Sequence, residues 1–409
     1  MNKYSNITKC PITDSSEGVK YFDLGNIPLV NNLCSSREES LTAERFPLDI
    51  NYYPNSGESS LSIAINSKLL FSKYLFKSEV NKPYYPHCQK MFYYIQNYIN
   101  LYDGVKIIDI GGNDGSLLDA FRSVSNYKLQ LLNIDPSENL STLSLDKNIP
   151  TKTAFFNHTI AEEINEKVEV IVSTNVFQHL RDINSFAKGV SLLLKDEGIW
   201  VLEFPYWIHD MQTNQFDQIY HEHVYYHSIR PMKMMMEKHG MKINNITKQK
   251  IHGGTLRLII SKESSRHTID NTVDNYLQLE EKYDLDYHLN WGNNIQNHIN
   301  ESSKFIKKLK EEGKTIFGFG AAAKGCVYLN AMGITNKEIN YIIDDTDLKQ
   351  NKYIPGTGIQ VVSRNILLEE TPDYILILPH NFLDFILKSL HSEYKGKFIT
   401  LIPNIKIHE

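Results

Sequence analysis

The sequence predicts an α/β protein with two domains built on parallel sheets, preceded by a small irregular domain. Three observations support this fold class. Strand-like and helix-like segments alternate through most of the chain, a glycine-rich turn follows a strand in two separate places, and each turn opens a helix. The length of 409 residues exceeds what one ordinary core accommodates, which also favours several domains.

The expected domains follow one another along the chain. Residues 1–65 carry turn signals and no long periodic segment, so an irregular domain is expected there. Residues 66–264 form the first alternating unit, with strands expected at 105–110, 129–134, 168–173 and 198–204 and helices at 115–124 and 185–194. Residues 265–409 form the second unit. It has a polar helical stretch at 270–312, strands at 315–319, 341–343 and 374–378, and helices at 324–331 and 382–390. This second unit is short for a complete six-stranded dinucleotide sheet.

Composition and charge argue against several classes of protein. The formal net charge of -5 and the absence of a polybasic block argue against nucleic-acid binding. No apolar run reaches the ~18 residues that span a bilayer, and the N-terminus lacks the apolar core of a signal peptide. No membrane insertion is therefore expected, and the location is expected to be cytoplasmic. The 4 cysteines are too widely spaced for a disulfide framework.

The first glycine turn favours a methionine-derived cofactor. Its glycines, at 111, 112 and 115, do not fit the G-x-G-x-x-G dinucleotide fingerprint, and an acid lies two residues before the first glycine. A sulfonium cofactor has no pyrophosphate, so the following helix need not hold an anion. Another acid ends the next strand, about 20 residues on, where a carboxylate usually binds a ribose diol. The expected cofactor residues are Asp109, Gly111, Gly112, Asn113, Asp135, Pro136, Phe156 and Asn175. The alternative is a generic α/β turn with structural acids and core aromatics.

A dense group of histidine, tyrosine and carboxylate side chains follows the strand at 198–204. At its centre is Tyr220-His221-Glu222-His223. The segment leaves the carboxyl end of a parallel strand, where such sheets place ligands, and histidine is the natural general base near neutral pH. Proton-transfer catalysis is predicted, with a metal site or an aromatic-rich surface loop as alternatives. His221 and His223 alternate faces on an extended segment, so joint metal chelation is not expected. His179, after another strand, can reach the same cleft or serve a structural role.

The second glycine turn reads G-x-G-x-x-A, in Gly318-Phe319-Gly320-Ala321-Ala322-Ala323. Because Asp344 ends the next strand, this turn passes the dinucleotide test better than the first. A nicotinamide cofactor therefore stays open at this point. The same geometry holds any nucleotide diphosphate, to which Lys324 adds positive charge, and a purely structural turn is the third possibility.

Several short segments, taken together and in order, point to one family. They are Pro47-Leu48-Asp49, Tyr74 with Lys77-Ser78, Gly111 to Leu118, Asn175-Val176-Phe177 with His179, Phe216-Asp217 with Tyr220 to His223, His252-Gly253-Gly254-Thr255-Leu256-Arg257, Gly318 to Gly325, and Pro355-Gly356-Thr357. With them the chain resembles, over nearly its whole length, the bacterial nucleotide-sugar C-methyltransferases that use S-adenosylmethionine (SAM). The best-known members of this family methylate C-3 of a nucleotide-linked 4-keto-6-deoxyhexose.

The resemblance implies three domains and a distribution of roles. It implies a small zinc-binding N-terminal domain, a class I SAM-methyltransferase Rossmann-like domain, and a Rossmann-like C-terminal domain that holds the nucleotide sugar. It implies His223 as the base, with Tyr74, His179, Tyr220 and Glu222 around the sugar. The substrate-binding residues expected on this basis are His252, Gly253, Gly254, Gly320, Ala322, Lys324, Asp344 and Asn381.

The chain departs from the family at the metal. The family has two Cys-x-x-Cys pairs, but here Cys10 is followed by Thr13 where the second cysteine is expected, and Tyr53 and Ser56 occupy the other pair. Because four thiolates close a structural zinc site, no zinc is expected, and Tyr53 is expected to pack the core instead.

The expected reaction is C-methylation through an enolate. A base removes a proton beside the ketone, and the resulting carbon attacks the sulfonium methyl in line. The expected partners are SAM and a nucleotide-linked keto-sugar, and the oligomeric state stays open. A sugar O-methyltransferase and an NAD-dependent nucleotide-sugar oxidoreductase that uses the turn at 318–323 are the alternatives. The departures at Cys326 and at Pro379-His380-Asn381 leave the exact sugar open.

Overall fold

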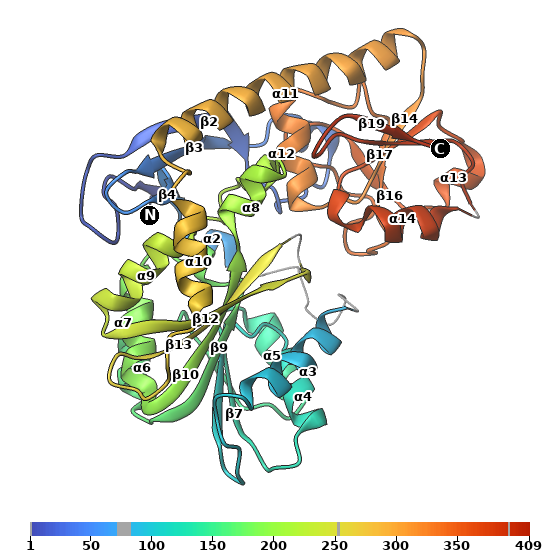
Figure 1. Ribbon diagram of the computed structural model, residues 1–409. Coiled ribbons are helices and arrows are strands. Elements are labelled where there is room, and N and C mark those ends of the chain that lie inside the picture. Colours follow the sequence, from blue (N-terminus) through green and yellow to red (C-terminus); the bar gives the residue numbers. More distant parts are fainter. Residues whose placement is uncertain (1, 72–82, 252–253, 392) are drawn as a thin grey trace.

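The computed structural model describes residues 2–71, 83–251, 254–391 and 393–409. Its strands form a seven-stranded, a six-stranded and a four-stranded sheet and a two-stranded ribbon (Figure 1). The 27-residue helix α11 (Leu285–Glu311) runs across the top of Figure 1, from the N-terminal strands to the C-terminal sheet. None of the helices in these described ranges combines the length and the apolar character that a membrane crossing needs.

The seven-stranded sheet has the strand order of a class I methyltransferase. The order is β12 (Met241–Gln249), β13 (Thr255–Lys262), β10 (Leu194–Pro205), β9 (Val168–Thr174), β6 (Lys106–Ile110), β7 (Gln130–Asp135) and β8 (Thr151–Thr153). Only β13 runs antiparallel to its neighbours. The predicted class I Rossmann-like fold is therefore confirmed.

Helices bury both faces of this sheet. Ile107, Val170 and Val201 pack on one face under α3 (Tyr84–Ile95) and α4 (Ser116–Val124). The alternate residues Ile108 and Ile171 lie in a second cluster, to which three further helices contribute: α6 (His158–Ile164), α7 (Ile183–Leu193) and α9 (Ile229–Lys238). Strands buried on both sides read as continuous apolar runs, which is why the sequence predicted them well. The helix α5 (Glu138–Asp146) joins β7 to β8, and α10 (Asn271–Glu280) precedes α11.

The C-terminal sheet has six strands, which corrects the expectation that this unit is too short for them. Their order is β16 (Gln360–Val362), β15 (Tyr341–Ile343), β14 (Ile316–Phe319), β17 (Tyr374–Ile377), β18 (Lys397–Thr400) and β19 (Lys406–His408). The first five are parallel and β19 is antiparallel. The unit fits because its strands have three or four residues and because no helix links β15 to β16. The helices of this unit are α12 (Ala323–Ala331), α13 (Ile366–Glu369) and α14 (Leu383–Leu390).

Residues 2–65 contain the strands β1 to β5, so the expected irregular structure of the N-terminal domain is wrong. The antiparallel sheet contains β11 (Tyr225–Tyr226), β4 (Glu58–Leu61), β3 (Arg45–Tyr53) and β2 (Val19–Pro28), and β1 (Tyr4–Asn6) pairs with β5 (Ile63–Ile65). Two register shifts between β2 and β3 break the period-two pattern that would have revealed the strands. In the chain, the short helix α1 (Arg37–Leu41) lies between β2 and β3, and α2 (Ser67–Phe71) follows β5.

The three sheets meet around one segment, residues 206–226. It contains α8 (Trp207–Gln212), the 3-10 turn η3 (Phe216–Gln218) and β11, which joins the N-terminal sheet. Phe216 packs against Tyr328 of α12 with ring centroids 5.0 Å apart, so the C-terminal unit contacts the same segment. The proposed domain boundaries at 65 and 264 separate the sheets except at β11.

Candidate active site

The first glycine turn brings β6 and α4 together at the carboxyl edge of the sheet. Gly111 and Gly115 have φ of 73° and 75°, and Asn113 has φ of 54°, all in the left-handed region. A Cβ on Gly112 would lie 2.5 Å from Asp109 Oδ2 and would also collide with Asn133. The backbone thus passes directly over the Asp109 carboxylate, where only glycine fits.

Asp135 supports the turn from the next strand. Its Oδ2 accepts a hydrogen bond from the Asn113 N–H at 2.9 Å, and its Oδ1 accepts one from the Ser137 N–H at 2.8 Å. Burial raises the pKa of this carboxyl. A carboxylate has about four acceptor positions, so Asp135 can still bind two ribose hydroxyls. Pro136, half-buried, lies between the two residues that make the second bond.

Asp109 is a buried acid without a partner. It is 1% exposed, and neither carboxylate oxygen has a hydrogen-bond donor in the described part of the chain. Burial, and then the nearby Asp135 and Asp114, raise its pKa well above the usual range. An unsatisfied buried acceptor of this kind fits a cationic donor such as the α-ammonium of SAM.

Two further residues expected at the cofactor, Asn175 and Phe156, lie in different surroundings. Asn175 follows β9 with φ of 55°, and its N–H donates to the Glu203 carbonyl at 2.8 Å, so it lies at the same sheet edge. Phe156 packs against Phe186 with ring centroids 5.1 Å apart and is 8% exposed, whereas Phe155 is 39% exposed. Phe155 is therefore better placed than Phe156 to meet an adenine ring.

A buried ionic cluster at this edge was not predicted from the sequence. Glu203, 0% exposed at the end of β10, pairs with Arg257 NH2 at 2.6 Å and with His87 Nε2 at 2.9 Å. These partners hold the pKa of Glu203 below its usual value. An acid inside the apolar run of β10 was the available signal, but its partners come from distant segments.

His223 is held in one tautomer by two hydrogen bonds. Its Nδ1 donates to the Gln218 carbonyl at 2.9 Å, and its Nε2 accepts from the Tyr220 hydroxyl at 2.7 Å. The basic nitrogen is therefore Nε2. Burial lowers the pKa of His223 well below its usual range, so the ring is neutral at pH 7.

His179 and Glu222 adjoin this base. The rings of His179, on the 3-10 turn η2 (Phe177–His179), and His223 have centroids 4.9 Å apart. His179 Nδ1 donates to the Glu222 carbonyl at 2.7 Å, and burial lowers its pKa to about 4. The Glu222 carboxylate accepts from Asn31 Nδ2 at 2.6 Å. In the described contacts, it is Gln218 and Tyr220 that orient the His223 ring, rather than Glu222.

The segment around the base is a turn, not the extended strand that was expected. The His223 N–H donates to the Tyr220 carbonyl at 2.8 Å. His221 points away, with Nε2 3.1 Å from the Pro47 carbonyl and its ring edge-on to Phe46. Burial lowers the pKa of His221 to about 4. His221 therefore anchors the segment to β3, and it does not chelate a metal together with His223.

Other residues of the protein pack against the second glycine turn. At Gly320, with φ of 89°, a Cβ would lie 2.6 Å from the Pro379 ring. Asp344 accepts from the N–H groups of Ala321 at 2.8 Å and Thr346 at 2.9 Å, and Lys349 pairs with it at 3.4 Å.

The remaining substrate residues are placed unevenly. Ala322 precedes α12 as its N-cap, and Lys324 lies in the first turn of that helix with its Nζ buried. Asn381 is exposed. Gly254, with φ of 127°, has no room for a Cβ beside His209. Tyr74, His252 and Gly253 lie outside the described residues.

Packed side chains occupy the position at which the family would bind zinc. Cys10 Sγ lies 3.2 Å from Ser56 Oγ, and Cys10, Ile12 and Tyr53 share one buried cluster. The prediction that Tyr53 packs this core is confirmed. Within the described ranges, no group of three or more histidine, cysteine or acidic side chains is arranged to hold a metal ion.

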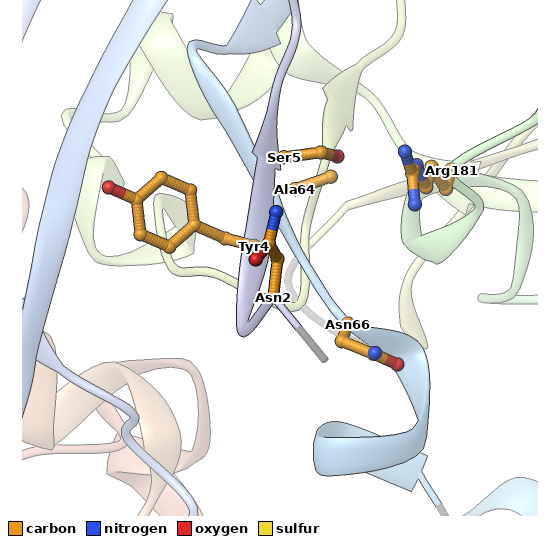
Figure 2. Close-up of a pocket in the computed structure, with 6 residues that line it drawn as sticks. All are labelled: Asn2, Tyr4, Ser5, Ala64, Asn66 and Arg181. Carbon is orange, nitrogen blue, oxygen red and sulfur yellow. The ribbon is translucent and has the colours of Figure 1, made fainter.

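A surface hollow of about 350 Å³ lies beside β1 and β5 (Figure 2). Figure 2 shows Arg181 facing it across Ser5 and Ala64. Its lining contains none of the predicted site residues and no carboxylate or imidazole. The hollow is therefore separate from the candidate active site.

Comparison with known proteins assigns both alternating units. Residues 71–245 match a methyltransferase domain family, and residues 250–403 match the C-methyltransferase C-terminal domain family. The C-methyltransferase NovU of Streptomyces niveus is 26% identical over 409 residues, which cover 98% of this chain and 97% of that protein.

Two further matches cover only part of the chain. The ubiquinone biosynthesis O-methyltransferase of Bradyrhizobium diazoefficiens is 26% identical over 107 residues, 25% of this chain and 41% of that protein. The solved structure of magnesium protoporphyrin IX methyltransferase from Synechocystis PCC 6803 with bound SAM is 13% identical, covers 45% of this chain and 81% of its own, and has a TM-score of 0.35.

The first alternating unit matches a methyltransferase domain, and the second matches a C-methyltransferase domain. The chain is therefore a SAM-dependent C-methyltransferase.

Proposed function

We propose that this enzyme methylates the ring carbon next to the ketone, C-3, of a nucleotide-linked 4-keto-6-deoxyhexose. The observation that carries the proposal is His223, a buried neutral imidazole whose basic Nε2 meets the Tyr220 hydroxyl. Such a pair can remove a proton from carbon and donate a hydrogen bond to the neighbouring oxygen. The sugar class rests on the family segments found throughout the sequence.

The edge of the seven-stranded sheet would hold the cofactor, which supplies an electrophilic methyl group on sulfur. Asp109 would accept from the α-ammonium, and Asp135 would accept from the ribose hydroxyls. Glycine at position 112 lets the backbone of the turn pass close over Asp109. Asn175 would border the reacting methyl group, because it follows β9 in the segment that leads to His179.

The chemical step needs one base and one hydrogen-bond donor. His223 Nε2 takes the proton as the Tyr220 hydroxyl turns to the ketone oxygen. The C–H electron pair moves toward that oxygen, and it returns as the new carbon–carbon bond forms. The electron pair of the broken carbon–sulfur bond stays on sulfur. His223 then releases its proton to solvent, and the ketone is restored.

The six-stranded sheet would hold the nucleotide sugar rather than a nicotinamide cofactor. Its order, 3-2-1-4-5-6 in chain numbering, is that of dinucleotide-binding folds. A nicotinamide cofactor and a nucleotide sugar both contain a diphosphate, so the choice of the sugar rests on the family segment Gly318 to Gly325. Asp344, the acid that would bind the adenosine ribose of a nicotinamide cofactor, is engaged by Lys349 and by two backbone N–H groups.

Hydrogen exchange tests this proposal without methyl transfer. A nucleotide-linked 4-keto-6-deoxyhexose is incubated in deuterium oxide with the enzyme and S-adenosylhomocysteine, and NMR follows the C-3 hydrogen. The wild-type protein should exchange it well above the enzyme-free rate, and His223→Asn should lose about 10²–10⁴-fold. Glu222→Gln should lose less, because its carboxylate contacts Asn31 rather than the base. Normal exchange by His223→Asn would contradict the assignment of the base.

A further inference from the structure

Lys324 is a buried cation without a hydrogen-bond partner among the described residues, and its helix packs on the turn that holds the base. Lys324 Nζ has no solvent contact and no hydrogen-bond acceptor among the described residues. A desolvated ammonium is strongly unfavourable unless an anion or a polar acceptor completes its shell. The folded chain thus holds a positive charge whose anion or polar acceptor is not among its described side chains.

The location of this cation is set by the contact between two domains. Helix α12, which carries Lys324, packs on η3 through Tyr328 and Phe216, and the carbonyl of Gln218 on η3 holds His223 Nδ1. The lysine and the base are therefore fixed to the same three-residue turn. Consistent with this placement, the charge of Lys324 is among the causes that lower the pKa of His223 and of His380.

Two acids act on the electrostatics around Lys324, and neither forms an ion pair with it among the described residues. Asp217 Oδ2 lies 3.5 Å from His380 Nδ1, and burial lowers the pKa of that imidazole. Asp210 is 1% exposed, and burial raises its pKa well above the usual range, which favours its neutral form.

Because the pKa of His223 is lowered, the active site must stabilise the product of proton transfer in another way. His223 is neutral and ready to accept a proton, but it is a weak base, and a hydrogen next to a ketone is weakly acidic. Proton transfer between such partners requires strong stabilisation of the negative charge that develops on the ketone oxygen. A preorganised cation in a water-excluded site is well suited to this task.

We propose that Lys324 is a catalytic residue that donates a hydrogen bond to the ketone oxygen of the sugar as the enolate forms. The proposal rests on the function proposed above and adds a role from the C-terminal domain. His223 takes the proton from carbon, and the C–H electron pair becomes the enolate whose oxygen Lys324 holds. Lys324 keeps its own proton throughout, and the charge leaves the oxygen when the carbon–carbon bond forms.

The diphosphate of the substrate is the other anion that Lys324 could bind, and kinetics separates the two. A diphosphate is charged in the ground state, so loss of its contact weakens substrate binding and leaves kcat largely intact. The enolate charge exists only near the transition state, so loss of that contact lowers kcat and leaves substrate affinity intact.

The test compares Lys324→Met and Lys324→Gln with the wild-type enzyme. For a nucleotide keto-sugar that the wild type accepts, both variants should lose about 10²–10³-fold in kcat and in deuterium exchange at C-3. The calorimetric Kd for that substrate should stay within about threefold, and Tm should not fall, because an unpartnered buried charge is removed. The matched control, Lys337→Met, replaces an exposed lysine of the same domain and should behave as wild type.

Three outcomes would overturn the role of Lys324. They are unchanged kcat in both variants, a tenfold or larger rise in Kd with kcat preserved, and equal losses in the Lys337→Met control. The second outcome would assign Lys324 to the diphosphate. If the wild-type enzyme itself neither exchanges nor methylates any nucleotide keto-sugar, the proposed function fails instead, and the two failures are thereby distinguished.

Discussion

Replacing Asp109 by Asn should stabilise the free protein and weaken its binding of S-adenosylhomocysteine. Asp109 is 1% exposed without a hydrogen-bond donor in the described structure, and its pKa is raised well above the usual range. A group whose pKa is raised on folding costs stability as the pH climbs above its unfolded value. At neutral pH, removing this charge should increase the free energy of unfolding by about 1–3 kcal/mol.

The same change removes the acceptor for the α-ammonium of the ligand. A hydrogen bond to a charged group contributes about 1.5–3 kcal/mol, which corresponds to roughly a 10- to 150-fold weaker affinity. Isothermal calorimetry measures the affinity, and scanning calorimetry of the ligand-free protein measures the stability. 5′-Methylthioadenosine, which lacks the amino-acid group, should bind the variant and the wild type equally.

Asp135→Asn is the matched comparison, because burial also raises the pKa of this carboxyl but two backbone N–H groups donate to it in the free protein. The variant loses these charge-assisted bonds, so it should gain less stability than Asp109→Asn. It should bind both ligands more weakly. If Asp109→Asn destabilises the free protein, or binds S-adenosylhomocysteine like the wild type, the reasoning about this carboxylate is wrong.

Three further predictions concern other parts of the chain. Burial lowers the pKa of His288, stacked on Tyr52, to about 4, so its stabilising contribution is present above about pH 6.5 and disappears as the pH falls toward 4. When the pH is lowered from about 7 to about 4.5, the free energy of unfolding of His288→Phe should therefore fall by roughly 2–3 kcal/mol less than that of the wild type. An equal fall in both proteins would contradict this prediction. Gly112→Ala should abolish binding of S-adenosylhomocysteine, because its Cβ meets Asp109 Oδ2 at 2.5 Å and must displace that carboxylate; retained affinity would contradict the role of Asp109. Purified protein should contain no tightly bound zinc and should keep its Tm in a chelator, because Tyr53 packs the core beside Cys10; stoichiometric zinc would refute this.

The class I sheet could be predicted because its strands are apolar on both faces. The predicted strand at 129–134 differs from the observed one by one residue at each end, and that at 168–173 by one residue at one end. In the C-terminal sheet, residues 341–343 form a strand with the predicted bounds. Asp109 and Asp135 could be placed because a strand end fixes their location without tertiary information. The N-terminal strands could not, since register shifts and a strand contributed by Tyr225–Tyr226 leave no continuous local pattern.

The candidate base could be located from the sequence, but its partners could not. The density of polar groups after β10 indicated a histidine base and the family resemblance implied His223, whereas the roles of Gln218 and Tyr220 depend on a turn that the sequence did not reveal. The Glu203, Arg257 and His87 cluster joins three segments, and only the folded sheet brings them together. The isolation of Lys324 Nζ is likewise a property of the domain contact and not of the motif.

The central claim is that the methyl group is attached to carbon beside the ketone of a nucleotide-linked sugar. The most direct test incubates the purified enzyme with SAM carrying a ¹³C-labelled methyl group and a panel of nucleotide-linked 4-keto-6-deoxyhexoses, and examines the product by NMR. The labelled methyl should couple directly to ring carbon C-3, with one C-3 hydrogen lost and the ketone retained. A labelled methoxyl group would show O-methylation, and the absence of labelled product from every nucleotide keto-sugar would contradict the proposed substrate.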